Sequence, residues 1–100
     1  MKTYSILFAD PDQKVHDGHR RMIRALRPDW NLLFAVSARE AMNKITLYRP
    51  EVVVSELNMK LEDGSDLLKA VQVAYPEVIR IVLSSEPDGE SEVILRSTQS

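Results

Sequence analysis

The chain has 100 residues, of which 44% are hydrophobic, which suits one globular domain and leaves no room for two. It contains no cysteine, which excludes disulfides, thiolate metal sites and a cysteine nucleophile. The formal net charge is −2 and the basic residues form no long run, so nucleic acid is not expected as a direct partner. The N-terminal apolar run is short and ends at Asp10, so we expect no signal peptide, no membrane span and a soluble cytoplasmic protein.

The first third of the chain alternates short apolar runs with one amphipathic stretch. Residues 4–9 combine β-branched and aromatic side chains, which predicts a strand that ends at the turn formers Asp10 and Pro11. A helix is predicted over residues 13–26, because apolar side chains recur there at three- and four-residue spacings. This apolar stripe consists of Val15, His19, Met22, Ile23 and Leu26. The same helix carries Arg20, Arg21 and Arg24 on what we expect to be a solvated face, and we expect His16 and His19 at its surface or at the edge of the stripe.

The alternation continues to the end of the chain. Residues 30–36 predict a second strand, after which Ser37 and Glu40 form a Ser-x-x-Glu capping box that predicts a helix ending before Pro50. Three consecutive valines, residues 52–54, predict a strand buried on both faces. The remaining predicted elements are a helix over residues 65–75, a strand over residues 78–83 and a fourth helix that begins at Pro87.

Strands that alternate with helices predict a parallel sheet with helices on both faces and right-handed crossovers. Nothing in the sequence indicates a domain boundary, so residues 1–100 are expected to form one domain. In such a sheet, binding and chemistry take place beyond the carboxyl ends of the strands. Glu56 directly follows the valine strand and therefore stands where a functional carboxylate is expected.

Three segments together resemble the receiver domain of bacterial two-component response regulators. They are ILFAD at residues 6–10, VVVSELNMKLEDG at residues 52–64 and RIVLSS at residues 80–85. The resemblance extends over nearly the whole chain and implies a flavodoxin-like, doubly wound α/β fold with the parallel strand order 2-1-3-4. The fifth strand and fifth helix of a complete receiver have no counterpart, so we expect a receiver-like domain that is incomplete at its C-terminus.

The resemblance also implies a set of site residues. In the family, a strand-three aspartate accepts a phosphoryl group from a histidine kinase, an acidic pair after strand one helps to hold Mg²⁺, and a hydroxyl and a lysine contact the phosphoryl group. By position, Glu56 matches the acceptor, Asp10 matches the first acid and Ser84 matches the hydroxyl. Asn58 matches the residue whose backbone carbonyl reaches the metal, and Lys60 replaces the usual loop proline.

Three departures from the family pattern argue against phosphoryl acceptance. Glu56 is one methylene longer than aspartate, which moves its carboxylate by about 1.5 Å, and a displacement of about 1 Å can slow a positioned reaction roughly a hundredfold. Pro11 stands at the second acidic position and has no side-chain oxygen, which leaves Asp12 as the nearest substitute. The strand-five lysine has no counterpart. We therefore expect a phosphorylation-independent pseudo-receiver that acts through protein contacts and is not an enzyme.

Alternatives remain open for the individual residues. Glu56 either mimics the phosphorylated state, with Ser84 as its partner, or is inert. Lys60 either pairs with Glu56 or is solvated. Asp10 and Asp12 form either an acidic pocket or a simple turn with Asp12 at a helix N-terminus. No cofactor is expected, and the alternative is Mg²⁺ held by Asp10, Glu56 and Asn58.

The missing fifth strand and helix affect which binding partners we expect. Without them, residues 78–83 form an apolar edge strand and part of one sheet face is bare, which predicts either a fragment of a longer protein or, as we favour, a homodimer. The other expected partners are a histidine kinase or an output domain. Two further functions stay as alternatives: a Mg²⁺-dependent phosphoacceptor, and a flavodoxin-like protein for a small ligand, which lacks support because no Gly-rich loop follows the first strand.

Overall fold

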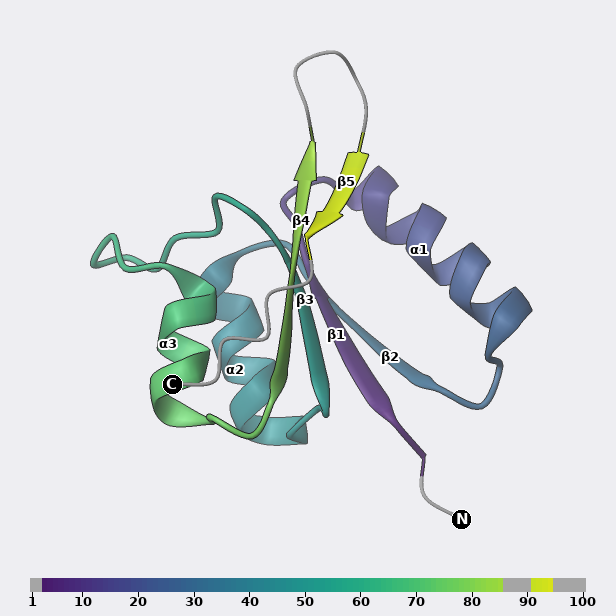
Figure 1. Cartoon of the computed structure of the whole chain (residues 1–100), viewed down its shortest axis with the longest axis horizontal. Helices are drawn as coiled ribbons and strands as arrows, with labels where there is room; N and C mark the ends of the chain where they lie inside the picture. Colours follow the sequence, from purple (N-terminus) through teal and green to yellow (C-terminus); the bar gives the residue numbers. More distant parts are fainter. Residues whose placement is uncertain (1–2, 86–90, 95–100) are drawn as a thin grey trace.

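A computed structural model describes residues 3–85 and 91–94 of the chain. Its elements are β1 (Ser5–Ala9), α1 (Gln13–Leu26), β2 (Asn31–Ala35), α2 (Ala38–Tyr48), β3 (Val52–Glu56), α3 (Leu67–Ala74), β4 (Ile79–Ser85) and β5 (Ser91–Ile94). They form one sheet with the order β2-β1-β3-β4-β5, in which β1 to β4 are parallel and β5 is antiparallel to β4 (Figure 1). The predicted doubly wound α/β fold with the parallel order 2-1-3-4 is confirmed.

The predicted fourth helix is wrong for the part of it that the structure describes. Residues 91–94 form β5, which pairs with residues 82–85 of β4, whereas Pro87, where the helix was predicted to begin, lies outside the described residues. Pairing with β5 gives hydrogen-bond partners to backbone N–H and C=O groups of the apolar strand β4, and a helix at residues 91–94 would not supply them. The expectation that the fourth strand is an edge strand is therefore wrong for its second half.

Helix α1 lies on one face of the sheet, and α2 and α3 lie on the other (Figure 1). Successive strand residues point to opposite faces, so β1 and β3 contribute to two separate cores. The larger core, under α2 and α3, includes Leu7, Val53, Ile45, Leu67 and Val71. The core under α1 contains Ile6, Phe8 and Val54.

The buried face of α1 differs from the predicted apolar stripe. Met22 and Leu26 are 52% and 69% exposed, whereas His16 is fully buried. The other members of the stripe, Val15, His19 and Ile23, are half-buried. The first half of α1 therefore makes the closer contact with the sheet, and the second half leaves much of its apolar surface in solvent.

Ser37 is the N-cap of α2 as predicted, but the return bond of the capping box goes to Val36 and not to Ser37. Ser37 Oγ accepts a hydrogen bond from the backbone N–H of Glu40 at 3.1 Å. The Glu40 carboxylate reaches back and accepts from the N–H of Val36 at 2.8 Å. The first bond gives a partner to one N–H group that a helix N-terminus leaves unsatisfied, and the second ties the helix to the residue that follows β2.

An apolar hollow of about 550 Å³ lies at the amino-terminal ends of β1, β3 and β4, and Tyr4 and Ile79 on its wall are 49% and 60% exposed. Val52 pairs in register with Ile6 on one side and with Ile79 on the other, so these side chains point to the face that α1 covers. Part of this face is therefore exposed in the described part of the chain. None of the described helices has the length and apolar character needed to cross a membrane.

Candidate functional site at the carboxyl ends of the strands

The predicted site residues Asp10 and Glu56 lie at the carboxyl ends of neighbouring strands. Ala9 of β1 pairs in register with Ser55 of β3, so Asp10 and Glu56 leave the sheet next to each other. On the other side, Glu56 pairs in register with Leu83 of β4. The fold therefore brings two carboxylates to the edge at which open α/β sheets carry their sites.

Asp10 organises the turn between β1 and α1. Its Oδ1 accepts a hydrogen bond from the N–H of Asp12 at 2.8 Å, and its own N–H donates to the carbonyl oxygen of Ala35 at 3.0 Å. Asp12 is the N-cap residue of α1, and its Oδ1 accepts from the N–H of Lys14 at 2.9 Å. Both carboxylates thus give an oxygen to the backbone of this turn.

The carboxylate of Glu56 turns towards its own loop. Its Oε2 accepts a hydrogen bond from the N–H of Asn58 at 2.9 Å, and the side chain is half-buried. The N–H of Leu57 donates to the carbonyl oxygen of Leu83 at 3.1 Å, which ties the start of the loop to β4. Asn58 therefore contacts Glu56 through its backbone N–H.

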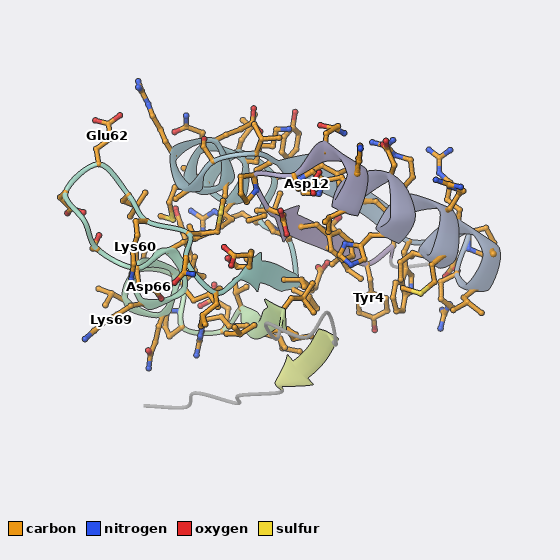
Figure 2. All side chains as sticks on the ribbon, turned by 90° about the horizontal axis from the view of Figure 1, so that it is seen from above. Tyr4, Asp12, Lys60, Glu62, Asp66 and Lys69 are labelled. Atoms are coloured by element: carbon orange, nitrogen blue, oxygen red, sulfur yellow. The ribbon has the colours of Figure 1, made fainter. Side chains whose placement is uncertain are left out.

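Lys60 lies close to Asp66 in this structure. The distance between Lys60 Nζ and Asp66 Oδ1 is 3.9 Å, and the two residues also form an isolated antiparallel backbone bridge. Figure 2 shows both on the loop before α3, well separated from Asp12 at the start of α1. The side chains are 54% and 38% exposed, so the ion pair contributes less than about 1 kcal/mol to stability. Among the described residues, the ion-pair partner of Lys60 is thus Asp66 and not Glu56.

His16 connects the ends of β1 and β2, and the sequence interpretation missed this role. Its Nε2 lies 2.8 Å from the carbonyl oxygen of Asp10 and 3.0 Å from that of Ala35. Both partners are acceptors, so Nε2 must carry the proton. The ring also packs edge-on against Phe34 at a centroid distance of 5.2 Å. The available signal was its place in the first turn of the helix, six residues after Asp10, where a side chain can reach the strand ends.

His19 lies one turn further along α1 and stacks on Phe8, with ring centroids 4.8 Å apart. Burial lowers the pKa of His19, and the nearby imidazole of His16 lowers it further, while Asp10 opposes both. The neutral imidazole is therefore the favoured form in the folded domain.

Ser84 lies in β4, one residue beyond the Leu83 that pairs with Glu56, and it pairs in register with Glu92 of β5. Its backbone is therefore at the same edge of the sheet as Asp10 and Glu56. The antiparallel β5 runs beside this part of the β4 backbone.

The donor set for a divalent ion at this edge is small. Asp10 and Glu56 each commit one carboxylate oxygen to a backbone N–H, which leaves one oxygen apiece. Mg²⁺ requires near-ideal octahedral oxygen geometry, with waters completing what one or two carboxylates provide. Within residues 3–85 and 91–94, no three His, Cys, Asp or Glu side chains come together to hold a metal. Asp10 and Glu56 are thus the two described carboxylates that a Mg²⁺ ion at this edge would use, with waters at the remaining positions.

One known regulatory protein is similar to this chain in sequence. No protein-family model matches the chain. The chain is 33% identical over 87 residues to the transcriptional regulatory protein YesN of Bacillus subtilis (strain 168), and the alignment covers 81% of the chain and 22% of YesN. The chain thus spans about a fifth of the length of that relative.

Two solved structures have the same architecture. One is the signal receiver domain of an HD domain-containing protein from Pseudomonas fluorescens Pf-5, with a TM-score of 0.69 and 27% identity over 87% of this chain and 68% of that one. The other is the isolated REC domain of RcsB from Salmonella enterica serovar Typhimurium, with a TM-score of 0.72 and 20% identity over 86% of this chain and 64% of that one. The strand order, the neighbouring carboxylates at the strand ends and these similarities identify the chain as a receiver domain of the kind found in two-component response regulators.

Proposed function

We propose that this domain is a phosphorylation-independent receiver that transmits a signal through protein–protein contacts. The observation that carries the proposal is the state of Glu56, whose Oε2 accepts a hydrogen bond from the N–H of Asn58 at 2.9 Å. Phosphoryl transfer depends on an acceptor oxygen placed in line with the leaving group and on cations that neutralise the developing charge. Here the acceptor-position carboxylate is bound to its own loop, and Lys60 lies beside Asp66.

The turn after β1 adds independent support. Pro11 occupies the second acidic position, which leaves Asp12 as the nearest carboxylate that could contribute to a metal site. Asp12 is the N-cap of α1, and its Oδ1 accepts from the N–H of Lys14. Moving this carboxylate to a metal would remove the cap, at a cost of about 0.5–2 kcal/mol. The use of Asp12 as a second metal-binding acid would therefore destabilise α1.

Phosphoryl acceptance can be tested directly on the full chain. The protein is incubated with Mg²⁺ and acetyl phosphate, and separately with Mg²⁺ and beryllofluoride, and is examined by intact mass and by amide NMR. We expect no added phosphoryl group and no shift of the Glu56 and Asn58 amide signals. The matched control is the double variant Pro11→Asp/Glu56→Asp, which restores both acidic positions and is expected to shift its signals with beryllofluoride.

A phosphoryl group gained by the natural sequence and lost in Glu56→Gln would overturn the proposal. That result would establish the alternative, a Mg²⁺-dependent phosphoacceptor. The alternative has its own support in the register of β1 and β3, because Asp10 and Glu56 leave the sheet as neighbours.

We further propose that the domain works in the cytoplasm with a histidine kinase or an output domain, and that it forms a homodimer. YesN is named as a transcriptional regulatory protein of which this chain spans about a fifth, which supports a partner domain with an output role. Support for the dimer comes from the apolar hollow on whose wall Tyr4 and Ile79 are 49% and 60% exposed.

The dimer is tested by light scattering across the micromolar range. Ile79→Glu places a charge in the hollow and is expected to shift the population to monomer. Val73→Glu is the matched control, because Val73 is 79% exposed on α3 and does not line the hollow. A monomer at every concentration, or equal effects of the two substitutions, would contradict the proposed dimer.

A further inference from the structure

Positive charge is concentrated on α1. The helix carries four basic residues and one acidic residue, a net +3, which leaves −5 on the rest of a chain whose formal net charge is −2. The basic residues are Lys14, Arg20, Arg21 and Arg24. Figure 2 shows nitrogen-tipped side chains projecting from this helix. The surface of α1 is thus the part of the domain that attracts a negatively charged partner.

A groove of about 530 Å³ runs between the second half of α1 and β2, which we name the α1–β2 groove. It is lined by Arg20, Arg24, Pro28, Trp30, Leu32 and Phe34. The guanidinium of Arg20 lies 4.6 Å from the centre of the Phe34 ring, and that of Arg27 lies 4.9 Å from the centre of the Trp30 ring. The groove therefore combines an aromatic and aliphatic floor with cationic groups held at its wall.

Of the two arginines that line the groove, only Arg20 has an ion-pair partner among the described residues. Arg20 pairs with Asp17 at 3.3 Å, a pair whose side chains are 38% and 49% exposed. Arg24 has no ion-pair partner among the described residues. The groove therefore presents at least one cation whose charge is not matched within the described part of the chain.

The strand beside the groove is the edge of the sheet. β2 stands first in the strand order and pairs with β1 on one side. Asn31 donates its N–H to Tyr4 and Ala35 accepts from Asp10, so these residues turn their backbone groups towards β1. Because these directions alternate along a strand, Leu32 and Phe34 turn theirs outward.

Contacts at the outer edge agree with this direction. The carbonyl oxygen of Phe34 accepts from Lys44 Nζ at 2.6 Å, so a lysine already protects one outward group. The N–H groups of Leu32 and Phe34 have no hydrogen-bond partner within the described ranges. Two backbone donors are therefore available beside the arginines of the groove.

We propose that the α1–β2 groove binds an extended acidic segment of another protein, which adds to the sheet along β2 and places carboxylates beside Arg20 and Arg24. Strand addition supplies backbone acceptors for the two outward N–H groups, and apolar side chains of the segment fill the floor between Trp30 and Phe34. A nucleic acid is also negatively charged, but it offers no peptide backbone that could pair with β2.

This inference extends the proposed protein-contact function without depending on the state of Glu56. The groove begins at Pro28 and Trp30, at the amino-terminal end of β2, whereas Glu56 lies at the carboxyl end of the parallel strand β3. Binding can therefore be measured without Mg²⁺ or a phosphoryl donor. Its failure would leave the phosphorylation-independent function untouched, and the reverse also holds.

The test uses a fluorescein-labelled peptide of alternating Glu and Val, with a peptide of alternating Lys and Val as the charge control. Fluorescence anisotropy with the full chain is expected to show saturable binding of the acidic peptide that weakens as salt is raised. Arg24→Glu is expected to weaken this binding roughly tenfold or more. Arg21→Glu makes the same charge change on an exposed residue of the same helix that does not line the groove, and its effect is expected to be much smaller.

Amide hydrogen exchange then tests the pairing with β2. The N–H groups of Leu32 and Phe34 are expected to exchange more slowly with the acidic peptide bound, while that of Leu33, which faces β1, stays unchanged. Equal binding of the Lys peptide, equal effects of Arg24→Glu and Arg21→Glu, or unchanged exchange at Leu32 and Phe34 would overturn the proposal. Displacement of the peptide by a single-stranded oligothymidylate would instead assign the groove to nucleic acid and would also overturn it.

Discussion

Replacing His16 by leucine tests whether a buried histidine holds the turn that positions Asp10. Leucine keeps an apolar side chain of comparable bulk in a fully buried place, so the cavity contribution is small. The substitution removes the Nε2–H that lies 2.8 Å from the Asp10 carbonyl and 3.0 Å from that of Ala35. The change in stability therefore reports mainly on these hydrogen bonds.

The magnitude follows from which acceptor loses its partner. The carbonyl of Ala35 still accepts from the N–H of Asp10 at 3.0 Å, so it remains satisfied. The carbonyl of Asp10 loses the His16 donor; the bond is part-buried, so the loss lies towards the lower end of the about 1–3 kcal/mol that an unsatisfied buried acceptor costs. His16 Nδ1 is itself buried with no partner in the described part of the chain, and its removal offsets part of this loss. We expect His16→Leu to lower the free energy of unfolding by about 1–2 kcal/mol.

Urea unfolding followed by far-UV circular dichroism measures this loss, and amide NMR reports on the turn. We expect the Asp10 amide signal to shift and its hydrogen exchange to accelerate in the variant. His19→Leu is the matched control on the same helix, because the His19 side chain makes no hydrogen bond to any described residue, and we expect a change within about 0.5 kcal/mol. If His16→Leu were as stable as the natural sequence, or left the Asp10 amide unchanged, the anchoring role would be refuted.

Three further predictions concern α1, the β3–α3 loop and α2. The pKa of His19 lies below its ordinary value of 6.5 in the folded domain, so the unfolded chain binds more protons below that pH. The urea midpoint is expected to fall as the pH drops below about 6.5, with a smaller fall in His19→Phe. Gly64 has a φ of 85° and open space around it, so Gly64→Ala is expected to cost about 1 kcal/mol, whereas Gly18→Ala within α1 is expected to gain about 0.5–1 kcal/mol, both by urea unfolding. Ser37→Ala removes the bond to the N–H of Glu40 and is expected to lower the thermal midpoint through a loss of about 0.5–2 kcal/mol, and an unchanged midpoint would contradict the cap.

Sequence signals predicted the helices and strands well where the signal depends on residues close together in the chain. The valine run predicted β3, and Ser37 with Glu40 predicted the start of α2, because both depend on neighbours close in sequence. The strand order also followed, but from the family resemblance and not from the residues alone. The positions of Asp10 and Glu56 at adjacent strand ends follow once that order is known.

The parts that the sequence did not predict depend on contacts distant in sequence. His16 is buried because the ends of β1 and β2 offer two carbonyl groups, neither of which is visible in a helical pattern. Met22 and Leu26 fit the apolar stripe, yet both are exposed, because burial depends on what packs against the helix and not on its own pattern. Residues 91–94 are compatible with a helix by local pattern, and their strand state reflects pairing with β4.

The uneven distribution of charge gives the domain an electric dipole. With a net +3 on α1 and −5 elsewhere, a charged partner that approaches exerts a torque on the domain as well as a force. Encounter is therefore biased in orientation before any atoms touch, over a range set by the Debye length of about 8 Å at physiological ionic strength. Dilute buffer lengthens that range and concentrated salt shortens it, so the salt dependence of the association rate reports which side of the molecule meets its partner first.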